Sequence, residues 1–213
     1  MNPKEFENKN PASFIENLVQ SSIPLEVQEK YTINFISYNR IVGEVHDDYF
    51  EKNNNKKTET YHAYEKDWDS LIHILKYSSD HDEAGYVNML RHVGPRGHIS
   101  NEDLYIPIID FAPDLDEIDN INLSKLLKPF SGNKIYIYDS GNSYHGILDK
   151  ILDFKDYKSW LSLLKDSDFV DQKWLEMATN NYFGNFQQVL RTTSGLNRPE
   201  PKFSRHTSYE QYL

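Results

Sequence analysis

Apolar residues recur at helical spacing in four parts of this chain, and each stretch predicts an amphipathic helix. The first helix is expected to begin at Asn10-Pro11, where proline suits the first turn, and to end at Pro24. The second is expected to begin at Trp68. The apolar positions of the four helices are Phe14, Ile15, Leu18 and Val19; Leu71, Ile72 and Leu75; Ile118, Ile121, Leu123, Leu126 and Leu127; and Tyr157, Trp160, Leu161 and Leu164.

Short runs of β-branched and aromatic residues predict strands between these helices. Pro107 lies inside one run, and because a proline in a sheet is tolerated mainly at an edge or a bulge, this run predicts an edge strand or a bulge near the site. Residues 43–60 are polar and predict a hairpin loop or an insertion. The expected strands cover residues 31–37 with 41–42, 86–90, 104–111, 134–138, 146–148 and 182–191.

The mixture of helices and strands, with a hairpin at its centre, predicts an α+β domain rather than a doubly wound one. We expect residues 1–84 to form an N-terminal αβ part of this domain and residues 85–203 to form its core. The chain after Arg198 is polar and contains prolines, so residues 204–213 are expected to be a C-terminal surface tail.

The segment Asp139-Ser140-Gly141-Asn142-Ser143-Tyr144-His145 joins two of the expected strands and carries candidate chemistry. Its Gly-Asn pair predicts a tight turn, so His145 should follow a hairpin closely. Exposed backbone N–H groups, the hydroxyls of Ser140 and Ser143 and the imidazole could together bind a phosphate oxygen. A solvated polar hairpin is the alternative interpretation. In either case, Tyr144 should face the opposite side of the sheet from His145.

Three short motifs occur in order around this turn. An apolar strand ends in Asp110, Ser143-Tyr144-His145 follows, and Phe169-Val170-Asp171 comes later. In the order and spacing of these motifs, the chain resembles the archaeo-eukaryotic primase, or primase-polymerase, superfamily over about residues 85–203. Residues 189–195 are similar to the arginine-bearing strand of that family. The resemblance implies a primase-like core, with an RRM-like antiparallel sheet and flanking helices.

The resemblance also implies a role for each matched residue. Asp110 and Asp171 would be catalytic and would hold Mg²⁺ or Mn²⁺. Arg191 would stabilise charge in the transition state. The implied nucleotide-binding residues are Ser140, Ser143, His145 and Arg191.

One departure from the family bears on catalysis. The first motif of the family has two aspartates at positions i and i+2, but Ala112 stands two residues after Asp110. Two-metal phosphoryl transfer uses several oxygens to hold ions about 3.5–4 Å apart. Two aspartates therefore predict a single ion completed by substrate phosphates, unless Asp114 replaces the missing ligand.

Charge opposes a simple nucleic-acid binder. The 213 residues carry a net charge of −10, which repels a polyanion overall. Two basic segments could still line a common cleft with His145, or could be solvated loops. They contain Arg91, His92, Arg96 and His98, and then Arg191, Arg198, Lys202, Arg205 and His206. The chain has no cysteine and no N-terminal apolar run, so we expect a cytoplasmic protein without a membrane span.

Three functions remain open from the sequence. The first is a primase-polymerase-like protein that binds nucleotides and single-stranded or primed nucleic acid, with possible metal-dependent nucleotidyl transfer. The second is a catalytically inactive relative that keeps the nucleotide or nucleic-acid site. The third is an acidic protein-interaction module. The resemblance adds a helicase or another accessory protein as an expected partner.

Overall fold

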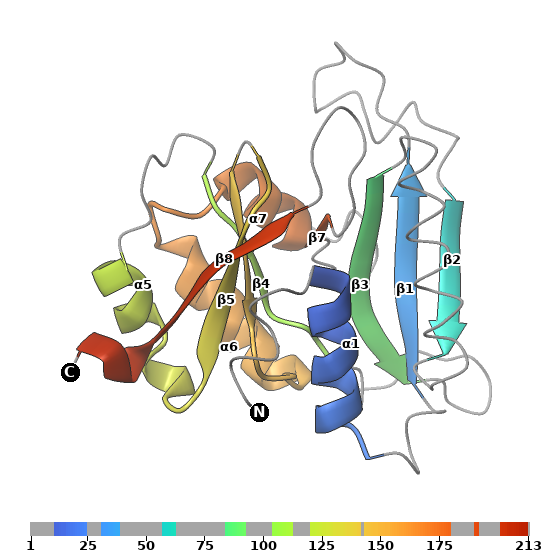
Figure 1. Cartoon of the computed structure of the whole chain (residues 1–213), viewed down its shortest axis with the longest axis horizontal. Helices are drawn as coiled ribbons and strands as arrows, with labels where there is room; N and C mark the ends of the chain where they lie inside the picture. Colours follow the sequence, from blue (N-terminus) through green and yellow to red (C-terminus); the bar gives the residue numbers. More distant parts are fainter. Residues whose placement is uncertain are drawn as a thin grey trace.

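The computed structural model describes residues 11–24, 31–38, 57–62, 84–92, 104–112, 120–141, 143–179, 190–191 and 201–212. These residues form two four-stranded antiparallel sheets, ordered β2-β1-β3-β7 and β4-β6-β5-β8 (Figure 1). The mixed α+β class is therefore confirmed. The strands are β1 (Tyr31–Tyr38), β2 (Lys57–His62), β3 (Ala84–His92), β4 (Ile108–Asp110), β5 (Lys134–Asp139), β6 (Tyr144–Leu148), β7 (Leu190–Arg191) and β8 (Lys202–Ser208).

Helices lie on both sides of the β4-β6-β5-β8 sheet (Figure 1). Among the described residues no helix is both long enough and apolar enough to cross a membrane. The α-helices are α1 (Pro11–Ser22), α5 (Asn120–Leu126), α6 (Phe154–Lys165) and α7 (Gln172–Thr179), and the 3₁₀ helices are η2 (Lys128–Phe130) and η3 (Tyr209–Tyr212).

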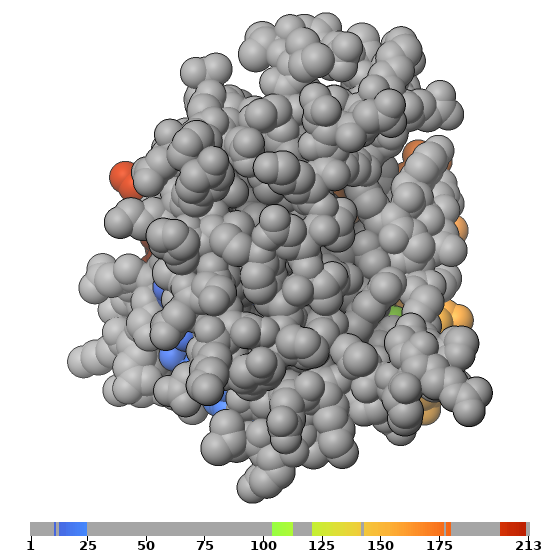
Figure 2. All heavy atoms as spheres, turned by 90° about the vertical axis from the view of Figure 1, so that its right-hand side faces the viewer, coloured from blue at the N-terminus to red at the C-terminus, as the bar shows by residue number. Residues whose placement is uncertain are grey.

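Helix α1 begins and ends where its proline and its apolar spacing predict. Its four predicted apolar residues are all 0% exposed, because they face the sheets. Phe14 packs against two tyrosines of β5, with ring centroids 4.7 Å from Tyr136 and 6.3 Å from Tyr138. Figure 2, which views the molecule from the side of β2, shows only small areas of α1. The helix thus covers the face of the sheet that carries Tyr136 and Tyr138.

Helix α6 covers the other face of this sheet. Asp153 caps its first turn by accepting a hydrogen bond from the Asp156 N–H at 2.8 Å. Trp160 is 0% exposed and donates its indole N–H to the carbonyl of Ile108 in β4 at 3.2 Å. Its ring meets Phe130 edge-on, with the centroids 5.5 Å apart. The predicted helix through Tyr157 is therefore confirmed, and it fixes the edge strand β4.

The edge position expected for the run with Pro107 is also confirmed, although the strand covers only Ile108–Asp110 and Pro107 lies just before it. Strand β4 is the outermost strand of its sheet and pairs only with β6 in the described part of the chain. The carbonyl of Pro107 accepts a hydrogen bond from the Leu148 N–H at 3.0 Å, and because Pro107 comes immediately before β4, the N–H that it lacks is missing at the end of the ladder rather than inside it.

Three sequence predictions differ from the structure. The expected loop over residues 43–60 is wrong at its end, because residues 57–60 belong to β2. Ile121, expected on an apolar face, is 52% exposed. The expected tail is wrong for residues 204–212, because β8 pairs with β5 along its length and η3 follows it.

The carboxylate of Glu210 joins η3 to the turn before β5. It accepts hydrogen bonds from the Gly132 N–H at 2.6 Å and from the Ser131 hydroxyl at 2.9 Å.

The limits expected for the three parts of the chain stay a prediction, although β3 joins residues 84–92 to the N-terminal sheet. The helix expected from Trp68 lies outside the described residues.

Asp149 provides a test of electrostatics in the β5–β6 hairpin. Burial raises the pKa of its carboxyl group, although the hydrogen bond from the Lys134 N–H opposes the rise. A raised pKa in the folded state means that the ionised group costs stability above that pKa, and that this cost disappears as the pH falls. We therefore expect Asp149→Asn to unfold at higher urea concentration than the wild type at pH 7.

This advantage should vanish near the ordinary pKa of aspartate, about 3.9. Urea titrations of both proteins at several pH values measure the difference. The expected direction would be contradicted if Asp149→Asn lost stability relative to the wild type as the pH rose from acid values to 7.

Candidate functional site

Asp110 and His145 are neighbours across the β4–β6 ladder. Strand β4 ends at Asp110 and β6 begins one residue before His145, so the ladder brings the two side chains to one end of the sheet. The His145 Nε2 atom lies 3.4 Å from Asp110 Oδ1. The imidazole side chain is 8% exposed and the carboxylate side chain 27% exposed, so the pair is partly accessible from the carboxylate side.

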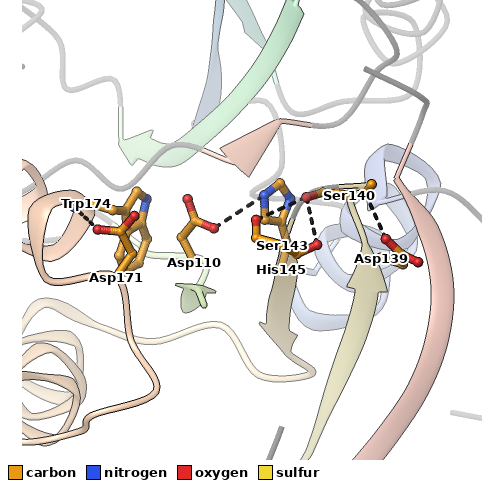
Figure 3. A network of polar contacts seen from close by, with 8 residues as sticks. Asp110, Asp139, Ser140, Ser143, His145, Asp171 and Trp174 are labelled. Carbon is orange, nitrogen blue, oxygen red and sulfur yellow. Dashed lines mark hydrogen bonds and ion pairs between the residues drawn. The ribbon is translucent and has the colours of Figure 1, made fainter. Parts of the chain in front are cut away.

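Asp171 reaches the same place through backbone pairing. Its N–H donates to the carbonyl of Asp110 at 2.9 Å, and Phe111 and Val170 form an isolated β-bridge. Figure 3 shows Asp110 between Asp171 and His145. The structure therefore brings together the three motifs that stand far apart in the sequence.

Asp171 also begins a helix that the sequence analysis missed. Its Oδ1 atom accepts hydrogen bonds from the N–H groups of Lys173 at 2.9 Å and Trp174 at 3.1 Å, which caps the first turn of α7. An aspartate before the apolar pair Trp174-Leu175 was the available signal for this helix. Within the described residues, the Oδ2 atom makes no hydrogen bond, so it is the oxygen left to a ligand.

The turn before His145 is held by its own polar groups. Gly141 has a φ of 91°, a left-handed conformation that suits glycine, and its N–H donates to Asp139 Oδ1 at 2.7 Å. The Ser140 hydroxyl donates to the Ser143 carbonyl at 2.8 Å, and the two hydroxyl oxygens are 3.2 Å apart. The Ser140 side chain thus has a structural contact in the turn (Figure 3), and its binding of phosphate, like that of Ser143, stays a prediction.

The register decides which side chains share the face of the site. Tyr138 lies opposite His145, and Tyr144 lies opposite Asp139. Because successive residues of a strand alternate between faces, Tyr144 lies on the face opposite His145, as predicted. Tyr138 is 0% exposed, and burial raises the pKa of its phenol far above its usual value. The phenol therefore remains neutral beside the site.

Arg191 is placed only by its backbone. It lies in β7, paired with Tyr86 of β3, and Figure 1 shows β7 between α7 and β3. Nothing in the structure describes its side chain, so its approach to the nucleotide stays a prediction. Arg96 and His98 lie outside the described residues. Arg205 lies opposite Ile137, so it faces away from His145.

The side chains at this site offer carboxylate oxygens as candidate metal ligands. In the described part of the chain, no three histidine, aspartate or glutamate side chains are grouped so as to hold an ion. Two aspartates on hydrogen-bonded backbone segments remain, and carboxylate oxygens are what Mg²⁺ and Mn²⁺ prefer. An ion held by these two carboxylates would need its other ligands from water and substrate, and its binding stays a prediction.

A comparison with protein families gives a match to the central part of the chain. No curated protein and no solved structure matches the chain. The family described as AEP-like, archaeo-eukaryotic primase 1D-like, matches residues 94–188. The matched segment contains Asp110, His145 and Asp171, the three residues that the fold brings together. The resemblance read from the motifs is thus confirmed by a family model that matches residues 94–188, a segment similar to the archaeo-eukaryotic primase-like family.

Proposed function

We propose that this protein is primase-polymerase-like and binds nucleotides at the site formed by Asp110, His145 and Asp171. The observation that carries the proposal is the position of Asp110, in contact with His145 on one side and bonded through its carbonyl to Asp171 on the other. All three residues lie within residues 94–188, the segment that the primase-like family model matches, and this supports a common role in binding a nucleotide. The β4-β6-β5-β8 sheet with its helices would be the RRM-like primase core.

The imidazole of His145 is the group that binds the phosphate. An imidazole N–H can donate a hydrogen bond to a phosphate oxygen. Burial to 8% exposure limits the movement of the ring, so the donor is fixed before the nucleotide arrives. Ser143 is partly exposed in the turn before His145, so its hydroxyl would donate to the same phosphate, and Arg191 would approach from β7.

Nucleotidyl transfer is the second candidate function, favoured by the direct backbone bond between Asp171 and Asp110. Together, the two carboxylates would hold one Mg²⁺ or Mn²⁺ ion. When bound, such an ion neutralises charge on the reacting phosphates. Asp110 would also orient His145, so its replacement affects both the ion and the phosphate donor.

Nucleic acid as a partner follows from the family rather than from the charge. The net charge of −10 leaves any template to the basic segments around β3 and β8. A single-stranded or primed strand is the proposed template, and a helicase or other accessory chain the proposed partner. A non-catalytic relative and an acidic interaction module are the outcomes that remain if nucleotide transfer or nucleotide binding is absent. The cytoplasm is the proposed location.

Nucleotide binding by the wild type and by His145→Ala tests the first proposal. We expect the substitution to weaken binding of a fluorescent nucleoside triphosphate at least about tenfold, which corresponds to about 1.4 kcal/mol. Fluorescence anisotropy with and without Mg²⁺ measures the dissociation constants. Tyr144→Phe is the matched control, because it changes the adjacent residue on the opposite face.

The control should bind within about twofold of the wild type, well inside the tenfold change that 1.4 kcal/mol represents. Equal binding by His145→Ala and the wild type would remove His145 from the site. A folded wild type that binds no nucleotide would leave the interaction module.

A further inference from the structure

Arg205 of β8 carries a buried, unpaired guanidinium edge on the face of the β4-β6-β5-β8 sheet opposite His145. Its Nε and Nη2 atoms are both buried and have no hydrogen-bond partner among the described residues. The residue as a whole is only partly exposed. These two nitrogens form one edge of the guanidinium, whose N–H groups match two oxygens of a carboxylate or phosphate.

An irregularity in the β5–β8 ladder places Arg205 on this face. Ile137 pairs with Arg205 but the next residue, Tyr138, pairs with Phe203, so Ser204 is the extra residue of a bulge. Arg205 therefore shares the face of Ile137, whereas Phe203 and Tyr138 share the face of His145. The guanidinium and the nucleotide site thus lie on opposite faces of one sheet.

Among the described residues, no carboxylate is paired with Arg205, and Asp156 of α6 lies 4.0 Å from Lys150 instead. Helix α5, which contacts β8, contains no acidic residue. Glu210 of η3 bonds to Gly132 and Ser131, and Asp139 of β5 bonds to Gly141. Neither forms an ion pair with Arg205 in the described structure. Because a guanidinium stays charged, its burial without a partner destabilises the folded state unless an anion compensates the charge.

Thr207 adds a second polar group to the same face. It lies two residues after Arg205, so both side chains leave the same side of β8. Thr207 is 1% exposed, and its hydroxyl oxygen has no hydrogen-bond partner among the described residues. A charged fork and a hydroxyl donor without acceptors are the complement of a tetrahedral oxyanion.

We propose that Arg205 and Thr207 form a second oxyanion site, for a phosphate ion or a small phosphorylated ligand, on the face opposite the nucleotide site. The anion accepts two hydrogen bonds from the guanidinium edge and one from the hydroxyl. It binds by removing the cost of the buried charge, so binding and stability are coupled. This inference does not depend on nucleotide binding at His145.

Thermal unfolding in sodium phosphate and in sodium chloride of equal ionic strength tests the proposal. In chloride, Arg205→Met should be at least as stable as the wild type, because it keeps the apolar stem and loses the unpaired charge. In phosphate, the melting temperature of the wild type should rise, and that of Arg205→Met should not. Arg205→Lys should weaken phosphate binding at least about tenfold, because lysine lacks the fork.

A direct measurement on the wild type covers a variant that fails to fold. The Nε–H resonance of Arg205 should shift with added phosphate and reach a plateau, and Thr207→Val should raise the concentration needed. The same titration in His145→Ala separates the two sites. A phosphate response that persists in Arg205→Met but disappears in His145→Ala would overturn this proposal and support the nucleotide site. An Arg205 resonance that does not respond, or an Arg205→Met protein less stable than the wild type in chloride, would also overturn it.

Discussion

Replacing Trp160 by alanine is expected to lower the free energy of unfolding by about 3–5 kcal/mol, the usual cost of deleting a fully buried tryptophan. Trp160 is 0% exposed, and it joins α6 to the sheet by packing and by one hydrogen bond. Its loss leaves a cavity beside Phe130 and removes the donor to Ile108. Chemical denaturation followed by circular dichroism measures the change.

A second substitution separates the two contributions. Trp160→Phe keeps an aromatic ring but removes the indole donor, so it should cost less than alanine. Because Ile108 lies two residues before Asp110, both variants should also weaken nucleotide binding under conditions where they stay folded. A loss below about 1 kcal/mol for Trp160→Ala would show that α6 does not hold β4, since a full cavity costs several times more.

The second large effect is expected in nucleotide incorporation on primed and unprimed single-stranded templates. If the protein transfers nucleotides, Asp110→Asn should reduce incorporation at least about a hundredfold, because losing an ion ligand removes several kcal/mol of charge stabilisation. Activity should require Mg²⁺ or Mn²⁺ and should stop with a chelator. Asp139→Asn is the matched control, because it alters a nearby exposed aspartate and keeps an oxygen for the Gly141 N–H.

The outcomes of this assay separate transfer from binding. Equal loss in both variants would indicate damage to the turn rather than to an ion site. Full activity in Asp110→Asn would remove Asp110 from catalysis. A wild type that binds nucleotide but incorporates none would identify a relative that has given up transfer, in keeping with the single aspartate of its first motif.

Local patterns predicted the elements whose structure depends on local chemistry. Helices α1 and α6 follow from apolar spacing, with a proline as the start signal of α1, and the β5–β6 hairpin follows from two apolar runs joined by a glycine turn. In these elements the burial pattern and the local preferences agree, so the sequence alone suffices.

The missed elements depend on partners that are distant in sequence. Strand β8 reads Lys-Phe-Ser-Arg-His-Thr-Ser, which lacks a clear alternation because a bulge changes its face midway. Helix α7 is short, and its capping aspartate was interpreted only as a metal ligand. No local sequence pattern predicts that β5 pairs with a strand more than sixty residues later in the chain.

The proximity of the three motifs was predictable, but their bonding was not. The motif order indicated that Asp110, His145 and Asp171 lie together, and the contacts of Asp110 with the other two residues agree, while their use as a nucleotide site stays a prediction. The uses that the protein itself makes of Asp171 and Ser140 were not predictable, because a cap and a turn contact depend on exact backbone geometry. The side chain of Arg191 stays untested.

The pairing of β8 with β5 has a consequence for folding during translation. Strand β5 ends at Asp139, but the strand that covers its edge begins at Lys202. During synthesis, the ribosome must therefore add more than sixty residues before this edge can be covered. Until then β5 offers an open row of backbone groups to other chains. A chaperone that holds the nascent hairpin would shield it, and slowing translation after residue 139 should increase aggregation.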